Sequence, residues 1–267
     1  MKRLASRKSV RSVKKSAGGS REAVVVRPCH GIAEFEACVA VERAVWRSAD
    51  LDVVPLPLFV VAAETGGQVL GAFVGRELIG FTLAFAGWRD RRPLLHSHMT
   101  AVLEAYRDQG IGRRLKLLQR DDALAREITV IEWTFDPLAN MNAHFNLMCL
   151  GAVTRRYLPN VYGITSSPLH ASLPTDRLLA EWHLQSSRVQ RILAGKRPRP
   201  SFLKRSVHVM VPAKMEALKQ SNPAAAIRLQ SRIRAQFTRW FDKGYAATAL
   251  ASGRAGIDYV LEPWGPE

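Results

Sequence analysis

The 267-residue sequence predicts an α/β protein in which helices flank a mixed central sheet, followed by a small C-terminal β-α-β-β unit. Segments rich in β-branched and aromatic residues alternate with amphipathic segments, as strands alternate with helices. A glycine-containing loop joins one of these strands to a basic helix. The hydrophobic fraction of 47% and the charged fraction of 23% are ordinary for a globular protein and exclude a wholly disordered chain.

The folded part begins with a strand, two helices and a hairpin. We expect a strand at 23–28, a helix between Ile32 and Trp46, a short helix at 57–64, and hairpin strands at 69–74 and 78–85. Apolar side chains fall on one face of the first helix. Gly66-Gly67 offers the left-handed cap that ends the second helix, and Gly75-Arg76-Glu77 forms the hairpin turn.

The middle of the chain continues with a strand, a helix, a strand, a helix and a strand. These elements are expected at 94–102, from about 111 to 125, at 128–135, at 140–150 and at 153–162. The segment 128–135 is rich in β-branched and aromatic residues and therefore predicts a buried strand. Gly151 is expected to close the short helix.

The composition changes near residue 186. We expect a folded domain at 23–185, a basic linker at 186–205 and a β-α-β-β unit at 206–267, because the segment 188–204 shows no core-forming pattern. In the last unit, a strand at 207–211 precedes a helix marked by Ile227 to Trp240 and a final hairpin at 245–261.

The first 22 residues predict a disordered basic tail. Residues 1–21 contain eight Lys and Arg side chains and no acid, which is half of the net charge of +16. This composition fits binding to nucleic acid or an anionic partner, an organelle transit peptide, or a solvated extension without function. The cysteines Cys29, Cys38 and Cys149 lack any CxxC spacing, so we expect no metal site and a reducing, cytoplasmic location. No apolar run approaches the roughly 18 residues of a membrane span.

The most informative segment is the loop between the strand at 94–102 and the helix that follows. Gly110 and Gly112 let the backbone turn tightly and approach a ligand closely. The free amides at the helix start and the side chains of Arg107, Arg113 and Arg114 suit a pyrophosphate. The alternative interpretation is an ordinary glycine loop before a basic helix.

The sequence R-x-x-G-x-G at 107–112 resembles the acyl-CoA-binding motif of the GNAT superfamily of N-acetyltransferases. The order of elements over 23–185 is also similar to that family, and no Gly-Lys-Ser/Thr of a P-loop is present. HSHM, LKLLQR, EWTFDPL, NAHFN and PTDRLLAEW resemble a bacterial GNAT subgroup with a C-terminal extension. The resemblance implies an enzyme that moves an acetyl group from acetyl-CoA, or another acyl-CoA, to an amine.

The resemblance also implies site residues. Cofactor contacts would come from the end of the motif strand, from the loop and from the following helix: Ala101, Val102, Leu103, Arg107, Gln109, Gly110, Ile111, Gly112, Arg113 and Asn140. Many family members carry a tyrosine at the position of Leu147, where it protonates the departing thiolate. Leucine cannot donate a proton, so Asn142, Asn146, Cys149 or solvent would have to take that role.

Two histidines of the motif strand are the expected proton acceptors. His96 aligns with the glutamate of histone-type GNAT enzymes, and His96 with His98 resembles the serotonin N-acetyltransferase pattern. An amine must be neutral to attack a thioester, and an imidazole accepts a proton near pH 7. Spacing by two places both side chains on one face of a strand. The alternative is a structural role for both rings in the sheet.

Acidic residues of the next strand compete for a role in the site. Glu132, Thr134 and Asp136 alternate and therefore share one face of that strand, where they could orient a histidine or bind the substrate amine. We include Glu132 among the expected catalytic residues. Equally, Asp136-Pro137 could form the turn that ends the strand.

A second class of function stays open alongside acyl transfer. The charge of +16, the basic tail and Leu147 are also typical of a non-catalytic GNAT-like module that binds RNA, the ribosome or an acidic protein. The C-terminal unit would then cover the acceptor site or form a homodimer interface. The sequence identifies neither the amine acceptor nor the acyl chain length.

Overall fold

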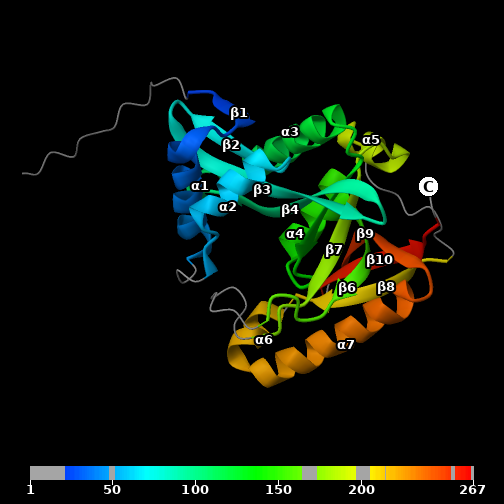
Figure 1. The fold of residues 1–267 in the computed structure, drawn as a ribbon. Coiled ribbons are helices and arrows are strands. Elements are labelled where there is room, and N and C mark those ends of the chain that lie inside the picture. The colour runs from blue at the N-terminus through cyan, green and yellow to red at the C-terminus, as the bar shows by residue number, and fades with distance from the viewer. Residues whose placement is uncertain are drawn as a thin grey trace, which may run out of the picture.

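The computed structural model describes residues 22–47, 52–163, 173–196, 205–213, 215–253 and 256–265; residues 1–21 of the predicted tail lie outside them. Within these ranges ten strands form one sheet in the order β1-β2-β3-β4-β5-β7-β6-β9-β10-β8 (Figure 1). The strands are β1 (Val24–Pro28), β2 (Gln68–Val74), β3 (Glu77–Arg89), β4 (Arg92–Val102), β5 (Val130–Phe135), β6 (Val153–Leu158), β7 (Arg177–His183), β8 (Val207–Pro212), β9 (Tyr245–Gly253) and β10 (Gly256–Pro263). The predicted mixed α/β architecture is confirmed.

Helices cover the sheet. They are α1 (Gly31–Trp46), α2 (Leu56–Glu64), α3 (Ile111–Ala125), α4 (Asn140–His144), α5 (Ser187–Leu193), α6 (Met215–Ser221) and α7 (Pro223–Phe241), with a 3₁₀ turn at Glu104–Tyr106 and a π-helix at Phe145–Leu150. The sequence predicted one helix over 140–150; its second half is a π-helix that Gly151 closes with a φ of 82°. Such π-helical turns are frequent at functional sites.

Alternation along the first strands separates two apolar layers. Val69 and Phe73 of β2 pack with α1 and α2, and Phe59 of α2 lies 5.7 Å from the ring of Phe81. Their neighbours Leu70 and Ala72 pack on the opposite face, against α3. Because side chains of a strand point alternately to opposite faces, helices on both faces are needed to bury them. The N-terminal part is therefore a three-layer structure.

The strands β3 and β4 form a hairpin longer than predicted. The sequence placed the end of β3 at Phe85, but pairing continues to Arg89 opposite Arg92. Asp90 and Arg91 connect the strands with φ values of 50° and 63°, the left-handed pair that a two-residue hairpin turn requires. The longer hairpin brings Arg89 toward β5.

The strands β4 and β5 are parallel but share only two paired positions. Leu95 lies opposite Ile131, and His96 lies opposite Glu132. Beyond His96, β4 runs on to Val102 without a partner strand on this side. A bulge lies at the same point, because the β3 partners jump from Ser97 to Met99 and leave His98 unpaired. The strands therefore part at this position.

The strand β7 is absent from the elements predicted from the sequence. This strand lies between β5 and β6 and pairs antiparallel with both. Every residue from Leu178 to Trp182 is buried, so the segment lacks the alternation that identified other strands. Because β7 follows β6 along the chain and inserts beside β5, only its non-local pairing reveals its place.

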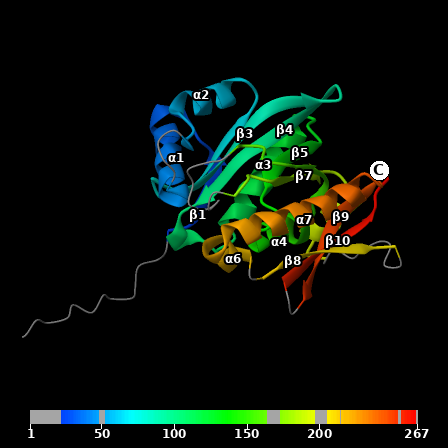
Figure 2. The ribbon, with the colours of Figure 1, turned by 90° about the horizontal axis from the view of Figure 1, so that it is seen from below.

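The C-terminal elements continue the same sheet through one pair between Thr154 of β6 and Ala247 of β9. Two helices, α6 and α7, lie between β8 and β9, where the sequence predicted one, and α7 crosses the C-terminal strands (Figure 2). Part of the expected linker, Ser187–Leu193, forms α5. Its Arg188 donates to the carbonyl oxygens of Leu147, Gly151 and Thr248.

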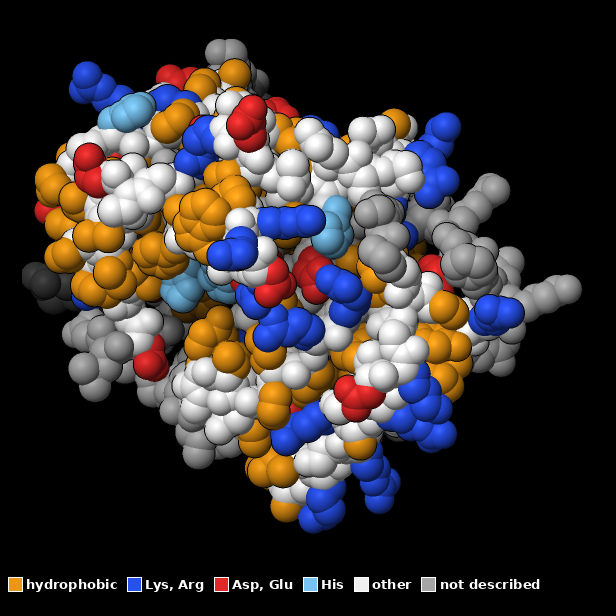
Figure 3. Space-filling view, turned by 45° about the vertical axis from the view of Figure 1, so that its right-hand side comes forward, with side chains coloured by type: hydrophobic (Ala, Val, Ile, Leu, Met, Phe, Trp, Pro, Cys, Tyr) orange, Lys and Arg blue, Asp and Glu red, His pale blue; other side chains and the backbone are white. Residues whose placement is uncertain are grey.

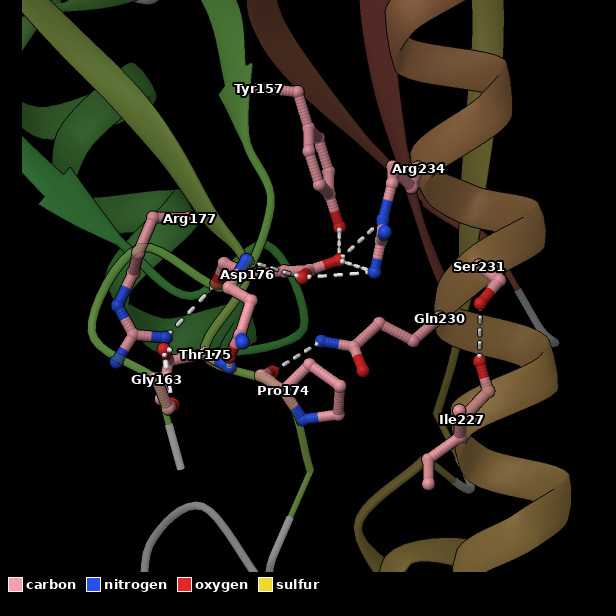
Figure 4. A network of polar contacts seen from close by, with 11 residues as sticks. Tyr157, Gly163, Pro174, Thr175, Asp176, Arg177, Ile227, Gln230, Ser231 and Arg234 are labelled. Atoms are coloured by element: carbon pink, nitrogen blue, oxygen red, sulfur yellow. Dashed lines mark hydrogen bonds and ion pairs between the residues drawn. The ribbon is translucent and has the colours of Figure 1, made fainter. Parts of the chain in front are cut away.

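A buried carboxylate fastens α7 to the rest of the fold (Figure 4). Asp176 is fully buried and accepts hydrogen bonds from Arg234 Nε at 2.9 Å and from the Tyr157 hydroxyl at 2.8 Å. Gln230 of the same helix donates to the carbonyl oxygen of Pro174 at 2.9 Å. A buried charge is tolerated only when it is paired, so this network holds α7 in one position.

Candidate active site

The loop before α3 leaves room beside its backbone. Gly110 has a φ of 74° and stands directly before the first residue of α3. A Cβ atom added at Gly110 or at Gly112 would meet no other atom within 4 Å. The first amides of a helix have no partners within the helix and attract anions. The loop therefore has both the open space and the donors that a phosphate group needs.

Basic side chains surround this loop. Arg107 and Gln109 are exposed and bond only to nearby carbonyl oxygens, those of Val102 and Ala105, at 3.2 Å each. Arg113 lies against the end of α5 and donates to Leu193 at 3.4 Å. The side chain of Ile111 is buried in the core, so only its backbone can serve a ligand.

Two more predicted cofactor positions lie along the opening between β4 and β5. Ala101 is buried and Val102 is partly buried on the stretch of β4 that lacks a partner strand on the β5 side. Leu103 follows the strand, is partly buried, and donates its amide to the carbonyl oxygen of Ile79 at 2.9 Å. Asn140 begins α4, and its Oδ1 atom is buried without a hydrogen-bond partner among the described residues. A donor group of a bound ligand would supply the contact that this buried oxygen lacks.

His96 is held by two residues of opposite charge. Its Nδ1 lies 3.3 Å from Glu132 Oε1, and the same carboxylate accepts two hydrogen bonds from Arg89, at 3.0 Å and 2.8 Å. The register of β4 and β5, which pairs these two residues, brings the imidazole and the carboxylate together. With Nδ1 protonated toward Glu132, Nε2 is the free acceptor of the neutral ring.

The carboxylate itself stays ionised. Burial alone would raise the pKa of Glu132, but the hydrogen bonds from His96 and Arg89 outweigh that effect and hold the pKa at about 2. A carboxylate this acidic is a poor proton acceptor near neutral pH. Its geometry suits the orientation of His96 and the stabilisation of a protonated ring.

His98 lies in the bulge of β4, next to the last paired position. Its ring packs edge-on against Phe85, with centroids 5.6 Å apart, and Phe85 is the β3 partner of His96. Burial within the fold and the nearby His96 both lower the pKa of His98. The two histidines are therefore neighbours, as the sequence predicted, although the bulge and not simple alternation sets the orientation of His98.

The position expected to carry a proton donor is apolar. Leu147 is fully buried in the π-helix. Of the alternatives considered from the sequence, Asn142 is exposed and Asn146 is buried. The Sγ atom of Cys149 lies 3.7 Å from His144 Nδ1, and burial raises the pKa of Cys149.

Two other predicted polar groups of β5 have structural partners. The Thr134 hydroxyl pairs with the Tyr162 hydroxyl at 2.8 Å. Asp136 Oδ1 accepts from the amide of Leu138 at 2.8 Å, which makes the strand-ending turn considered above.

Arg89 was not predicted as a site residue because its segment was expected to be a loop; the strand in fact continues past Phe85 to Arg89. Figure 3 shows acidic, basic and histidine side chains close together near the middle of one face of the molecule.

Residues 36–145 match the sequence model of the acetyltransferase (GNAT) family. The chain carries a GNAT acetyltransferase domain. The matched range contains the loop, His96, His98 and Glu132. No curated protein sequence matches the chain.

Solved GNAT acetyltransferase structures are similar to part of this chain at low sequence identity. A GNAT-family protein from Desulfovibrio desulfuricans matches 61% of this chain and 99% of its own, with 12% identity and a TM-score of 0.50. The ribosomal-protein-S18-alanine N-acetyltransferase of Escherichia coli matches 62% of this chain and 96% of its own, with 12% identity and a TM-score of 0.49. A Salmonella typhimurium protein solved with acetyl-CoA matches 61% and 95%, with 17% identity and a TM-score of 0.47.

The described ranges contain neither a metal-binding cluster nor a membrane-spanning helix. No three His, Cys, Asp or Glu side chains in these ranges are grouped as a metal ion would require. In the same part of the chain, no helix is both long and apolar enough to cross a membrane.

Proposed function

We propose that this GNAT protein transfers an acetyl group from acetyl-CoA to a primary amine by direct attack, with His96 as the general base. The observation that carries the proposal is the contact of His96 Nδ1 with the ionised Glu132, at the position where β4 and β5 part. It leaves Nε2 free to accept a proton beside a strand edge that has no partner.

The residues present fit the cosubstrate. The backbone amides at Gly110 to Gly112 and the side chain of Arg113 would hold the pyrophosphate. The edge of β4 that faces β5, up to Val102, would bond the pantetheine amides, and the buried Oδ1 of Asn140 would accept a further hydrogen bond. When bound, the cosubstrate supplies the activated acyl group as a thioester.

The residues of the chain then have two tasks, to position the amine beside the thioester and to remove a proton from the amine. His96 takes a proton from the amine through Nε2, and Glu132 stabilises the imidazolium that results. Backbone amides on the unpaired edge of β4 polarise the acyl carbonyl. His98, next to His96 and with a lowered pKa, stays neutral and orients the amine or a water. No covalent intermediate on the protein is needed.

The cosubstrate site is tested by Gly110→Asp, with Gly244→Asp as the control. The two glycines have φ values of 74° and 76°, and at neither would a Cβ meet an atom within 4 Å, so the backbone strain of the two substitutions matches. In calorimetry with acetyl-CoA, wild type and Gly244→Asp should bind. Gly110→Asp should lose binding, because its carboxylate faces the pyrophosphate. Equal affinity in all three folded proteins would exclude this site.

Binding to an anionic partner is the second candidate function. The net charge of +16 and exposed arginines that follow α7 at helical spacing favour it: Arg228, Arg232 and Arg239. If RNA is the partner, log affinity should fall linearly with log salt concentration with a slope near −0.7 per phosphate contact. If the rate of acetyl transfer is the same with and without RNA, RNA binding has no part in catalysis.

A further inference from the structure

Lys116 of α3 is a buried cation at the point where β4 and β5 part. Only 4% of its surface is exposed. Its Nζ donates to Ser97 Oγ at 2.7 Å and to Gln119 Oε1 at 3.0 Å, and it lies 4.1 Å from the centre of the Trp133 ring. Two neutral acceptors and an aromatic face satisfy its hydrogen bonds but do not neutralise its charge.

The charged groups of the neighbouring elements are engaged elsewhere. Glu132 precedes Trp133 on β5 and points to the opposite face, where Arg89 and His96 hold it. Asp122, further along α3, accepts from Gln68 and Arg126. On β4, His96 and His98 flank Ser97 and contact Glu132 and Phe85. Burial is accordingly the cause that lowers the pKa of Lys116, to about 7.

The position of Lys116 relates it to the cosubstrate. Ser97 and Trp133 are the first residues beyond the last paired position of β4 and β5, and Nζ bridges them. Lys116 also follows the phosphate loop by about one turn of α3. A pantetheine arm that starts at the loop and runs back along 101–103 of β4 therefore points its sulfur toward Ser97, about 13 Å from Ala101 at 3.3 Å per residue.

We propose that Lys116 stabilises the coenzyme A thiolate that leaves when the thioester is cleaved, and returns a proton to it through the Ser97 hydroxyl. This inference rests on the acetyl transfer proposed above. It assigns the role of proton donor to Lys116, which lies behind β4, because the buried side chain of Leu147 has no proton to donate.

The step balances as follows in protons and electron pairs. The amine nitrogen forms a bond to the acyl carbon, the carbon–sulfur bond breaks, and sulfur keeps the electron pair. The Ser97 hydroxyl gives its proton to sulfur while Lys116 Nζ gives one to Ser97 Oγ. His96 holds the proton from the amine, and exchange with solvent after release restores both groups.

The test compares coenzyme A with desulfo-coenzyme A, which lacks only the sulfur. Affinities are measured by calorimetry between pH 6 and pH 9. A nearby cation lowers the pKa of an acidic group by about one to three units. Wild type should therefore prefer coenzyme A most strongly in the pH range between the pKa of Lys116 and that of the thiol, because the pair needs a charged lysine and an ionised thiolate at the same time. Lys116→Met and Lys116→Gln should bind both ligands with equal affinity at every pH.

Lys219→Met is the matched control. Lys219 is also buried, with 6% of its side chain exposed, but it lies on α6 and pairs with Asp136 at 3.7 Å. This variant should keep the preference for coenzyme A. A wild-type protein that binds both ligands without preference, or a preference that survives in both Lys116 variants, overturns the inference and leaves the acetyl transfer standing. Failure of folded wild type to bind either ligand overturns the proposed function itself.

Discussion

Replacing Lys116 by methionine should change the pH dependence of stability in a defined direction. Methionine has a similar length and no charge, so it fills the same space between Ser97 and Trp133. The variant loses the hydrogen bonds to Ser97 and Gln119 but no longer carries a buried cation. Only the second effect depends on pH.

The magnitude follows from the pKa of Lys116. Burial lowers it from 10.5 to about 7, and each pKa unit corresponds to about 1.4 kcal/mol. Below pH 7 the native state must hold a buried ammonium, which costs roughly 5 kcal/mol. Between pH 7 and 10.5 the unfolded chain binds more protons than the native one, so wild-type stability rises with pH by about 1.4 kcal/mol per pH unit. The penalty disappears above the unfolded pKa.

The loss of hydrogen bonds in the variant is independent of pH. Leaving the buried Ser97 and Gln119 without this partner costs about 1–3 kcal/mol for each unsatisfied group. At one pH, the free energy of unfolding of the variant relative to wild type combines a gain from removing the charge and a loss of hydrogen bonds, which are similar in size. The change of this difference with pH depends only on the charge of Lys116.

The assay is urea unfolding of wild type and Lys116→Met at pH 7 and pH 9. The free energy of unfolding of the variant relative to wild type should fall by about 2 kcal/mol between these values, because wild type becomes more stable. Comparing the two proteins cancels the titration of every other group. A difference that stays constant from pH 7 to pH 9 would refute the reasoning, since Lys116 would then titrate near its ordinary pKa.

Further predictions concern the base and the C-terminal helix. His96→Ala should lower kcat by a factor of about 100 to 10,000 with little change in acetyl-CoA affinity, and His98→Ala by less; equal rates in wild type and both variants would reduce the histidines to packing. Glu132→Gln should lower kcat about 10- to 100-fold and shift the acid limb of the pH–rate profile, because the neutral amide no longer orients and stabilises His96; an unchanged profile would exclude that role. Arg234→Met should destabilise the protein by about 3–5 kcal/mol in urea unfolding because it leaves a buried carboxylate unpaired, whereas the exposed Arg232→Met should change stability by under about 0.5 kcal/mol.

Local patterns in the sequence predicted the elements that depend on local physics. The helix of Ile32 to Trp46, the hairpin turn after β2 and the glycine loop before α3 each follow from side-chain periodicity or from glycine's backbone freedom. The turn is one residue shorter than predicted, because β3 already begins at Glu77. The loop also predicts a ligand site at the end of β4, and this location stays a prediction. These features need no knowledge of what lies across the sheet.

Features that depend on long-range pairing could not be obtained in this way. The strand β7 has no alternation of polar and apolar residues because both its faces are buried. Its pairing with β5 and β6 depends on residues that are distant in the sequence. The contact of His96 with Glu132 required the parallel pairing of β4 and β5. Lys116 belongs to an amphipathic helix that carries several other basic residues, so its sequence position does not distinguish it from an exposed lysine. Only the packed structure reveals that its charge is buried.

The two proton-handling groups of the proposed reaction occupy opposite faces of one position in the sheet. His96 and Glu132 form the last pair of β4 and β5, and on the next residues, Ser97 and Trp133, the side chains point the other way, toward Lys116. A thioester held in the opening between the strands would therefore have a proton acceptor on one side and a proton donor on the other. His96 must be neutral to accept a proton, and Lys116 must be charged to donate one. Because the sheet separates the two side chains, Lys116 does not protonate His96 before the amine binds.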